Sequence, residues 1–125
     1  MSRIISLCFA CGKIQRKGEI VKIPFSYSDL VEAKARPALV LYHDLEKRQL
    51  TVAYITANTT NIGPTDILIT SGSPTCNMAG LPKTSVLKVH WLAVVKRIHV
   101  IGKYGETDDE LRRQVNKNLP ECLAI

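Results

Sequence analysis

Three strand-like segments follow one another in the first half of the chain, and their pattern constrains the fold more than any other feature. In Gly18–Phe25, apolar side chains recur at every second residue and so share one face of an extended chain. Pro24 has no N–H to donate, so this strand is predicted to lie at an edge or to end nearby. Ala38–Tyr42 is almost wholly apolar, as expected for a buried strand. A charged turn at 43–48 leads into a strand at Gln49–Thr56, and the two segments predict a hairpin.

The remainder of the chain predicts further strands and one helix. Extended segments are predicted at Asp66–Thr70, Lys83–Trp91, Leu92–Val95 and Ile98–Ile101, with a loop from Ser71 to Pro82. Thr107–Glu110 has the pattern of a capping box at a helix start. Apolar residues then recur at every fourth position (Leu111, Val115, Leu119), and Pro120 is predicted to end the helix. Many short strands followed by one helix predict a mainly β domain, a small barrel with a C-terminal α-helix packed on it.

Length and charge narrow the class of protein without locating a site. The chain has 125 residues, enough for one domain, and its 17 Lys and Arg against 11 Asp and Glu give a formal charge of +6. This excess favours a polyanionic partner, but the basic residues are spread along the chain. No run approaches the ~20 apolar residues of a membrane-spanning helix. The short apolar stretch Ile4–Ala10 lacks a convincing signal-peptide cleavage site, so we expect a cytoplasmic protein.

Four cysteines raise the question of a metal or redox site. Cys8 and Cys11 are spaced like half of a zinc ribbon, because two thiolates two residues apart can share one metal ion. Cys76 and Cys122 are isolated, so the second half of such a site is missing. We therefore expect reduced thiols with no metal and no cofactor, while a redox pair between Cys8 and Cys11 stays open.

The order and spacing of the strand segments resemble the MazF/PemK family, the ribonuclease toxins of bacterial toxin–antitoxin pairs. The resemblance is densest in Gly18–Phe25, Lys34–Leu41, Ile55–Thr56, Gly80–Val86 and Ile101–Lys103. It divides the chain into an N-terminal extension of unknown role (1–17) and a toxin domain (18–125). It implies an SH3-like barrel of the MazF/CcdB-like kind, usually a homodimer, that cleaves single-stranded RNA without a metal. It also implies a cognate antitoxin whose C-terminal peptide occupies the RNA groove.

The resemblance assigns catalytic roles to two residues at strand ends. Arg36, immediately before Pro37, matches the family's catalytic arginine. A guanidinium group can hold two non-bridging oxygens of a phosphate while charge develops on them. Thr56 matches a family threonine or serine that hydrogen-bonds the scissile phosphate. Without the resemblance, Arg36 would be read as a surface arginine that begins a strand, and Thr56 as an ordinary β-strand threonine.

His90 and Trp91 depart from the family, in which many members carry an acidic residue followed by glutamine at this point. Histidine titrates near neutrality, so His90 is a candidate for the general acid or base. An equally weighted alternative is a histidine whose ring bonds only the backbone or a dimer partner. Lys88 shares its strand face and is a candidate for contacting phosphate. Trp91 is read as a core or interface anchor.

Three further residues are predicted to contact RNA. The loop at 26–34 resembles the variable loop that closes over RNA and antitoxin in the family. In it, Tyr27 is placed to stack on a base and Lys34 to meet a phosphate. Lys83 is the third predicted RNA contact. A solvated hairpin loop is the alternative for 26–34.

These observations predict a metal-independent toxin endoribonuclease. The chain has no Gly-rich phosphate loop, no paired-carboxylate metal site and no Gly-x-Ser-x-Gly elbow, which disfavours a nucleotide hydrolase, a metallonuclease or an esterase. One alternative is a barrel that binds RNA or an antitoxin without cleaving. Another is a toxin with a protein target, since a gyrase-inhibiting family shares the barrel. Arg36 and Thr56 favour the ribonuclease, because a protein-directed toxin needs no phosphate-holding arginine.

Overall fold

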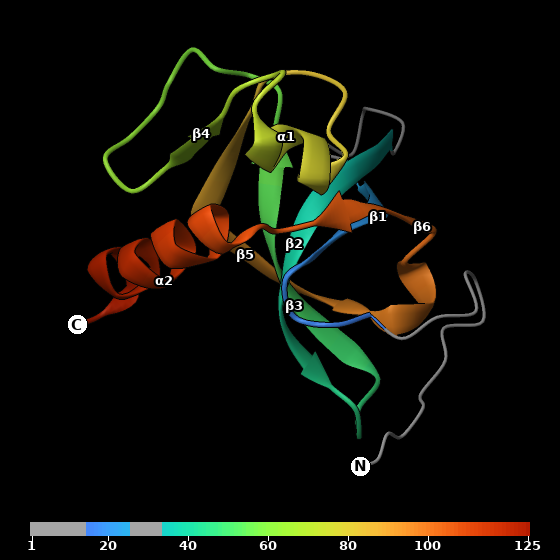
Figure 1. Ribbon diagram of the computed structural model, residues 1–125. Coiled ribbons are helices and arrows are strands. Elements are labelled where there is room, and N and C mark those ends of the chain that lie inside the picture. Colours follow the sequence, from blue (N-terminus) through green and yellow to red (C-terminus); the bar gives the residue numbers. More distant parts are fainter. Residues whose placement is uncertain (1–14, 26–33) are drawn as a thin grey trace.

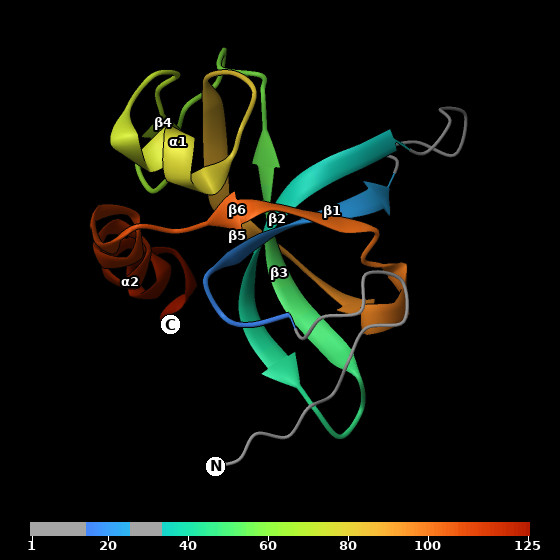
Figure 2. The same ribbon diagram turned by 45° about the vertical axis from the view of Figure 1, so that its right-hand side comes forward.

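In the computed structural model, which describes residues 15–25 and 34–125, six strands form one antiparallel sheet in the order β4-β5-β3-β2-β1-β6. The strands are β1 (Glu19–Phe25), β2 (Lys34–Asp44), β3 (Gln49–Thr56), β4 (Ile67–Ile69), β5 (Ser85–Lys96) and β6 (Gly102–Glu106). The helices are α1 (Pro74–Ala79), the 3-10 turn η1 (Arg97–His99) and α2 (Asp109–Leu123). The sheet curls into a half-barrel with α2 beside it (Figures 1 and 2), which confirms the predicted mainly β fold with a C-terminal helix.

Alternation along the strands gives the sheet two apolar faces. Ile20 on β1 packs on one face, with the helices, and its neighbour Val21 packs on the other, together with Ile23. The first face includes Leu39, Ala53, Ile55, Leu87, Val89, Leu111 and Val115, and the second Ala38, Val40, Leu50, Val52 and Val100. Full burial of each valine, leucine or isoleucine side chain among them contributes about 1.5–3 kcal/mol. The predicted shared face of Val21 and Ile23 is therefore confirmed.

Pro24 lies where β1 pairs on one side only. β6 pairs with β1 along Glu19–Lys22, and Pro24 pairs with Ala35 of β2. Within the described residues no strand pairs with the other side of Pro24, so its missing N–H interrupts no ladder. β1 lies between β2 and β6 and is not an edge strand, so that alternative was wrong. The other alternative, a strand that ends near Pro24, is confirmed, because β1 ends at Phe25.

The short helix α1 bridges the two edge strands of the sheet, β4 and β6 (Figure 2). It follows β4 and packs against β6 so closely that the two backbones touch. A Cβ on Gly80 would lie 1.9 Å from the Tyr104 carbonyl oxygen, and one on Gly105 would lie 2.3 Å from the Met78 oxygen. Glycine is required at both positions because no side-chain atom fits between these backbones.

The predicted loop at 71–82 was wrong, because it contains α1. Ser73 caps this helix by accepting a hydrogen bond from the Cys76 N–H at 3.1 Å. Pro74 occupies the first turn, and Gly80 ends the helix with φ of 71°. Each of these signals is typical of a helix boundary, but only six residues lie between them, too few to show an apolar stripe.

The C-terminal third required four further corrections. The runs at 83–91 and 92–95 belong largely to one strand, β5, and the run at 98–101 is occupied mainly by η1. β6 was not predicted, because its sequence is polar and contains two glycines. The capping residue of α2 is Asp108, which accepts the Leu111 N–H at 2.8 Å, while the Thr107 hydroxyl donates to the Gly18 carbonyl.

Helix α2 also continues past Pro120, which was predicted to end it. The helix runs to Leu123, and the Pro120 carbonyl still accepts the Ala124 N–H at 2.9 Å. Proline removes one donor from the helix but keeps its acceptor, so the last turn closes around it. The predicted stripe is confirmed, since Leu111 and Val115 are buried and the Leu119 side chain packs against the same core.

We expect Gly105→Ala to lower the free energy of unfolding by about 2–3 kcal/mol, because its Cβ meets the α1 backbone. Gly102→Ala on the same strand is the matched control. Its Cβ would meet Lys22 only at an ordinary 3.8 Å, and we expect a change within about 0.5 kcal/mol. Urea unfolding of both variants measures the difference, and equal stabilities would contradict the close backbone packing of α1 against β6.

Candidate functional site

Arg36 and Thr56 come together where β2 begins and β3 ends. Ala38 of β2 pairs with Tyr54 of β3, and continuing this antiparallel register by two residues brings Arg36 opposite Thr56. Both side chains are half-buried and line one cavity of about 500 Å³. The other lining residues are Ala57, Asn58, Asn61, Lys88 and Trp91. The structure thus brings the two predicted phosphate ligands into one cavity.

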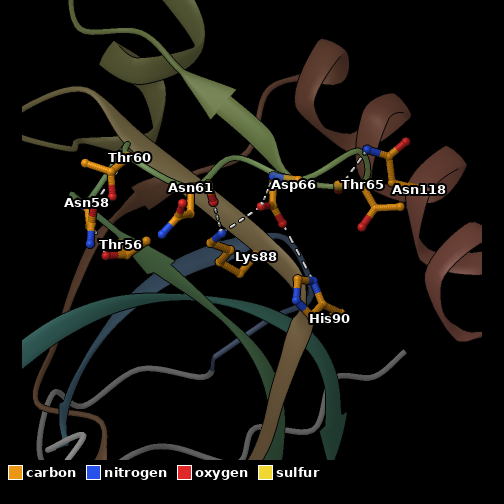
Figure 3. Close-up of polar contacts among 10 residues, drawn as sticks. Thr56, Asn58, Thr60, Asn61, Thr65, Asp66, Lys88, His90 and Asn118 are labelled. Atoms are coloured by element: carbon orange, nitrogen blue, oxygen red, sulfur yellow. Dashed lines mark hydrogen bonds and ion pairs between the residues drawn. The ribbon is translucent and has the colours of Figure 1, made fainter.

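Short-range hydrogen bonds order the loop that follows Thr56 (Figure 3). The Thr56 hydroxyl oxygen accepts the Asn58 N–H at 3.1 Å. The Asn58 side-chain oxygen accepts both the N–H and the hydroxyl of Thr60, at 3.0 and 2.6 Å. These bonds are typical of Asx and ST turns. Because Thr56 uses its oxygen as the acceptor, its hydroxyl proton can still be donated to a ligand in the cavity.

A buried ion pair attaches this loop to β5. Lys88 Nζ lies 2.7 Å from Asp66 Oδ2, and the two side chains are only 10% and 2% exposed. The same ammonium donates to the Asn61 carbonyl at 2.8 Å, and the Gly63 N–H donates to Asp66 Oδ2 at 2.7 Å. At the far end of the loop, the Asn118 side chain of α2 donates to the Thr65 carbonyl at 3.0 Å (Figure 3). Lys88, predicted to contact RNA, therefore directs two of its three N–H donors into the protein.

Asp66 was not identified from the sequence, and it is the central acceptor of this network. Burial opposes its ionisation, but hydrogen bonds from Lys88 and from the Gly63 N–H, with the nearby positive charges, hold the pKa of Asp66 below its ordinary value. Asp66 and Lys88 lie 22 residues apart in sequence, so no local pattern links them. The preceding Gly-Pro-Thr turn was the only local feature, and it indicates a loop.

His90 lies beside the Arg36–Thr56 cavity and not in it. Its Nδ1 is 3.6 Å from Asp66 Oδ1, and its side chain is 42% exposed. It lines a neighbouring cavity of about 440 Å³, which shares Asn61, Lys88 and Trp91 with the first. His90 and Lys88 share a strand face, as predicted, since both reach the same carboxylate (Figure 3).

An irregularity in β5 explains this arrangement. Ala53 of β3 pairs with Leu92 of β5, whereas Ile55 pairs with Leu87. The segment 88–91 therefore lies opposite Tyr54 alone, which is a large β-bulge. Bulges bend a strand and turn side chains out of the regular alternation. Lys88, His90 and Trp91 all belong to this bulge.

The remaining predicted RNA contacts are not gathered at the cavity. Lys34 is exposed at the start of β2, and Lys83 is exposed in the turn before β5. Neither lines the two cavities described above. Tyr27, with most of the 26–34 loop, lies outside the described residues, as do Cys8 and Cys11.

His43 has a structural contact, since its Nδ1 lies 2.7 Å from the Gln15 carbonyl oxygen and burial lowers the pKa of its imidazole.

Across 15–25 and 34–125 there is no cluster of three or more His, Cys, Asp or Glu side chains that could hold a metal ion. In the same part of the chain, no helix has the length and apolar character needed to cross a membrane.

The half-barrel and its arginine- and lysine-lined cavity define a small β protein with a cationic site, and comparison with known proteins identifies its family. A family model described as "PemK-like, MazF-like toxin of type II toxin-antitoxin system" matches residues 16–123. The chain therefore belongs to the PemK/MazF-like toxin family of type II toxin–antitoxin systems. No curated protein matches the chain.

Solved structures with the same fold include three toxins of this kind. A mycobacterial endoribonuclease in complex with its cognate antitoxin is 14% identical, with a TM-score of 0.67 over 90% of this chain and 97% of that one. The Mycobacterium tuberculosis toxin MazF-mt6 is 17% identical, with a TM-score of 0.66 over 86% and 97%. MazE-MazF from Deinococcus radiodurans is 15% identical, with a TM-score of 0.65 over 90% and 97%. These similarities establish the MazF-like fold.

We expect Asp66→Asn to lower the free energy of unfolding at pH 7 by about 3 kcal/mol, because it leaves the buried Lys88 charge uncompensated. The folded-state pKa of Asp66 lies below its ordinary value of 3.8, so its contribution is present above that pH and is lost as the pH falls through the folded pKa. The difference from wild type should therefore shrink as the pH falls below the ordinary value and through the lower folded-state pKa.

Urea unfolding at several pH values measures this difference. Glu46→Gln, which removes a carboxylate from the exposed turn at 45–48, is the control, and we expect no comparable effect from it. A destabilisation of Asp66→Asn that stayed constant down to pH 2 would show that the carboxylate charge is not what anchors the loop.

Proposed function

We propose that the protein is a toxin endoribonuclease that cleaves single-stranded RNA without a metal. The observation that carries this proposal is the meeting of Arg36 and Thr56 in one cavity of a PemK/MazF-like toxin fold. A cavity with a guanidinium, a hydroxyl and nearby amide side chains suits a phosphodiester, which offers several oxygens to such donors. The net charge of +6 favours approach of a polyanion.

In the proposed reaction, the ribose 2′-oxygen attacks the adjacent phosphorus and loses its proton to a base. The P–O5′ bond then breaks, and O5′ takes up a proton. The products are a 2′,3′-cyclic phosphate and a free 5′-hydroxyl. Arg36 holds two non-bridging oxygens as negative charge develops on them, and Thr56 donates its hydroxyl proton to one of these oxygens.

His90 is proposed to move the proton, and Asp66 to orient it. The ring turns Nδ1 toward the buried carboxylate, so Nε2 points away from it. A carboxylate beside one ring nitrogen fixes the tautomer and stabilises the imidazolium that forms during transfer. His90 lies in the neighbouring cavity, so this role requires the RNA strand to extend across Trp91, which lines both cavities.

Two protein partners accompany this proposal. One is a cognate antitoxin, supported by family membership and by related toxins whose structures contain their antitoxins. The other is a second copy of the chain, supported by apolar side chains exposed on and beside β5, among them Val94 and Ile98. A cytoplasmic location is proposed with them, because RNA and antitoxin would be met there.

A second candidate function is a barrel that binds RNA or antitoxin without cleaving. The position of His90 outside the Arg36–Thr56 cavity favours it, because a general base must lie within hydrogen-bond reach of the proton that it removes. The same cleavage experiment separates the two candidates.

We expect wild-type protein in EDTA to cut long single-stranded RNA at discrete positions, and Arg36→Ala to reduce the rate by about 10²–10³-fold. Arg36→Lys should recover only part of this loss, because an ammonium cannot hold two phosphate oxygens in the same fork. Arg113→Ala is the control for lost charge, since this exposed arginine on α2 pairs with Glu110 and is expected to leave the rate unchanged.

Mapping the fragment ends gives the readout. Terminal 2′,3′-cyclic phosphates would support the proposed chemistry. Intact RNA with wild-type protein, in the presence of measurable RNA binding, would favour the non-cleaving barrel. Strong inhibition by EDTA would contradict the metal-independent mechanism.

His90→Ala should slow single-turnover cleavage by about 10²-fold, as expected for loss of a general acid or base. Gel analysis of a short labelled RNA at saturating protein measures this step apart from binding. His99→Ala, in the exposed turn η1, is the matched control. If His90→Ala cleaves as fast as wild type, proton transfer belongs to another group.

A further inference from the structure

Trp91 is exposed at the junction of the two cavities. Its side chain lines both of them, and the residue is 40% exposed. It belongs to neither apolar cluster of the sheet, so of its two expected roles, core anchor or interface anchor, the first is wrong. A large aromatic side chain left open beside Arg36 and Lys88 requires an explanation other than packing.

The indole ring is held in place by its neighbours. Lys88 Nζ lies 5.3 Å from the ring centroid, within the range of a cation–π contact. The His90 ring meets it edge-on, with centroids 6.2 Å apart and planes at 70°. Lys88 is itself held by Asp66 and by the Asn61 carbonyl. This chain of contacts orients an exposed aromatic surface before any ligand binds.

The surroundings of the ring suit a nucleobase. The cavity that Trp91 lines also contains Arg36 and Thr56, the proposed phosphate ligands. Asn58 and Asn61 line it as well. The Asn58 side-chain oxygen already accepts two hydrogen bonds from Thr60, so its amide group is left to donate to a base edge, while an amide side chain such as that of Asn61 can both donate and accept. Each nucleotide of a single-stranded RNA carries an anionic phosphate next to a planar aromatic base, so it could contact the phosphate ligands and the indole ring together.

We propose that Trp91 is the stacking platform for one unpaired base of the bound RNA, next to the phosphate held by Arg36 and Thr56. This inference rests on the proposed function and names a contact that the proposed mechanism does not require. Stacking on an aromatic side chain is tolerant of sequence, so Trp91 contributes affinity and register along the strand. Any preference for one base is then expected to come from hydrogen bonds between its edge and the amide groups of Asn58 and Asn61.

Trp91 is the only tryptophan in the chain, so tryptophan emission reports on the surroundings of this one residue. The probe is a mixed-sequence single-stranded RNA with every 2′-oxygen methylated, which cannot supply the attacking oxygen. Its fluorescent end label reports binding through polarisation. We expect tryptophan emission to be quenched over the same RNA concentrations at which polarisation rises. Trp91→Ala should weaken binding about 10-fold or more, and Trp91→Phe should retain most of it.

An abasic strand of the same length tests for stacking itself. It should bind wild type and Trp91→Ala equally, without quenching, because it has a backbone but no bases. If the role of Trp91 were only structural, Trp91→Ala would bind both the RNA and the abasic strand more weakly, and this result would overturn the proposal. Circular dichroism of the variants checks that they are folded.

Two outcomes separate this inference from the proposed function. A rise in polarisation with unchanged tryptophan emission, and equal binding by Trp91→Ala, would overturn stacking and leave the Arg36–Thr56 site intact. Polarisation that does not rise with RNA concentration would contradict RNA binding itself, and therefore also the stacking proposal. Emission that changes on dilution of the protein alone would show that a second copy covers Trp91, which also overturns the proposal.

Discussion

The buried ion pair between Lys88 and Asp66 holds one wall of the candidate site in place. An ion pair with so little exposure pays a desolvation penalty that its Coulomb attraction offsets only when further hydrogen bonds satisfy both groups. Here the Gly63 N–H and the Asn61 carbonyl supply them. The pair also bears on the site itself, because Asp66 lies beside the His90 ring and Lys88 lies over the Trp91 ring.

The site has two sides that are held in different ways: the Arg36 and Thr56 side by the sheet, and the His90 and Trp91 side by the ion pair between Lys88 and Asp66. Arg36 and Thr56 are placed by the register of β2 on β3, which is set by hydrogen bonds and by apolar alternation on both faces. The bulge at 88–91 leaves the regular ladder, and the ion pair fixes it instead. Loss of the ion pair should therefore disturb the His90 and Trp91 side of the site, while the Arg36 and Thr56 side is retained.

The sequence predicted the parts of the molecule that local patterns determine. Alternation in β1, the continuous apolar run in β2 and the hairpin pattern that leads into β3 predicted these strands. The family resemblance gave Arg36 and Thr56 as candidate site residues, and the structure brings them together in one cavity. Asp66 could not be found in this way, because its importance comes from a contact with Lys88 across the fold.

Failures of sequence reasoning have similar physical causes. The helix α1 is too short to show periodicity, and β6 is stabilised by its neighbours despite a polar sequence. The bulge of β5 has no local signature, so the outward position of Trp91 could not be anticipated. Pro120 does not end α2 as predicted, because a proline near a helix end can be accommodated in the last turn.

The central claim is that the cavity between Arg36 and Thr56 holds the phosphate at which RNA is cut. A crystal structure with an RNA oligonucleotide that carries a 2′-deoxy nucleotide at the mapped cleavage position tests it most directly. We expect the phosphate that follows this nucleotide to lie within hydrogen-bond distance of the Arg36 guanidinium and the Thr56 hydroxyl. An oligonucleotide bound elsewhere, with this cavity lacking a phosphate, would contradict the account.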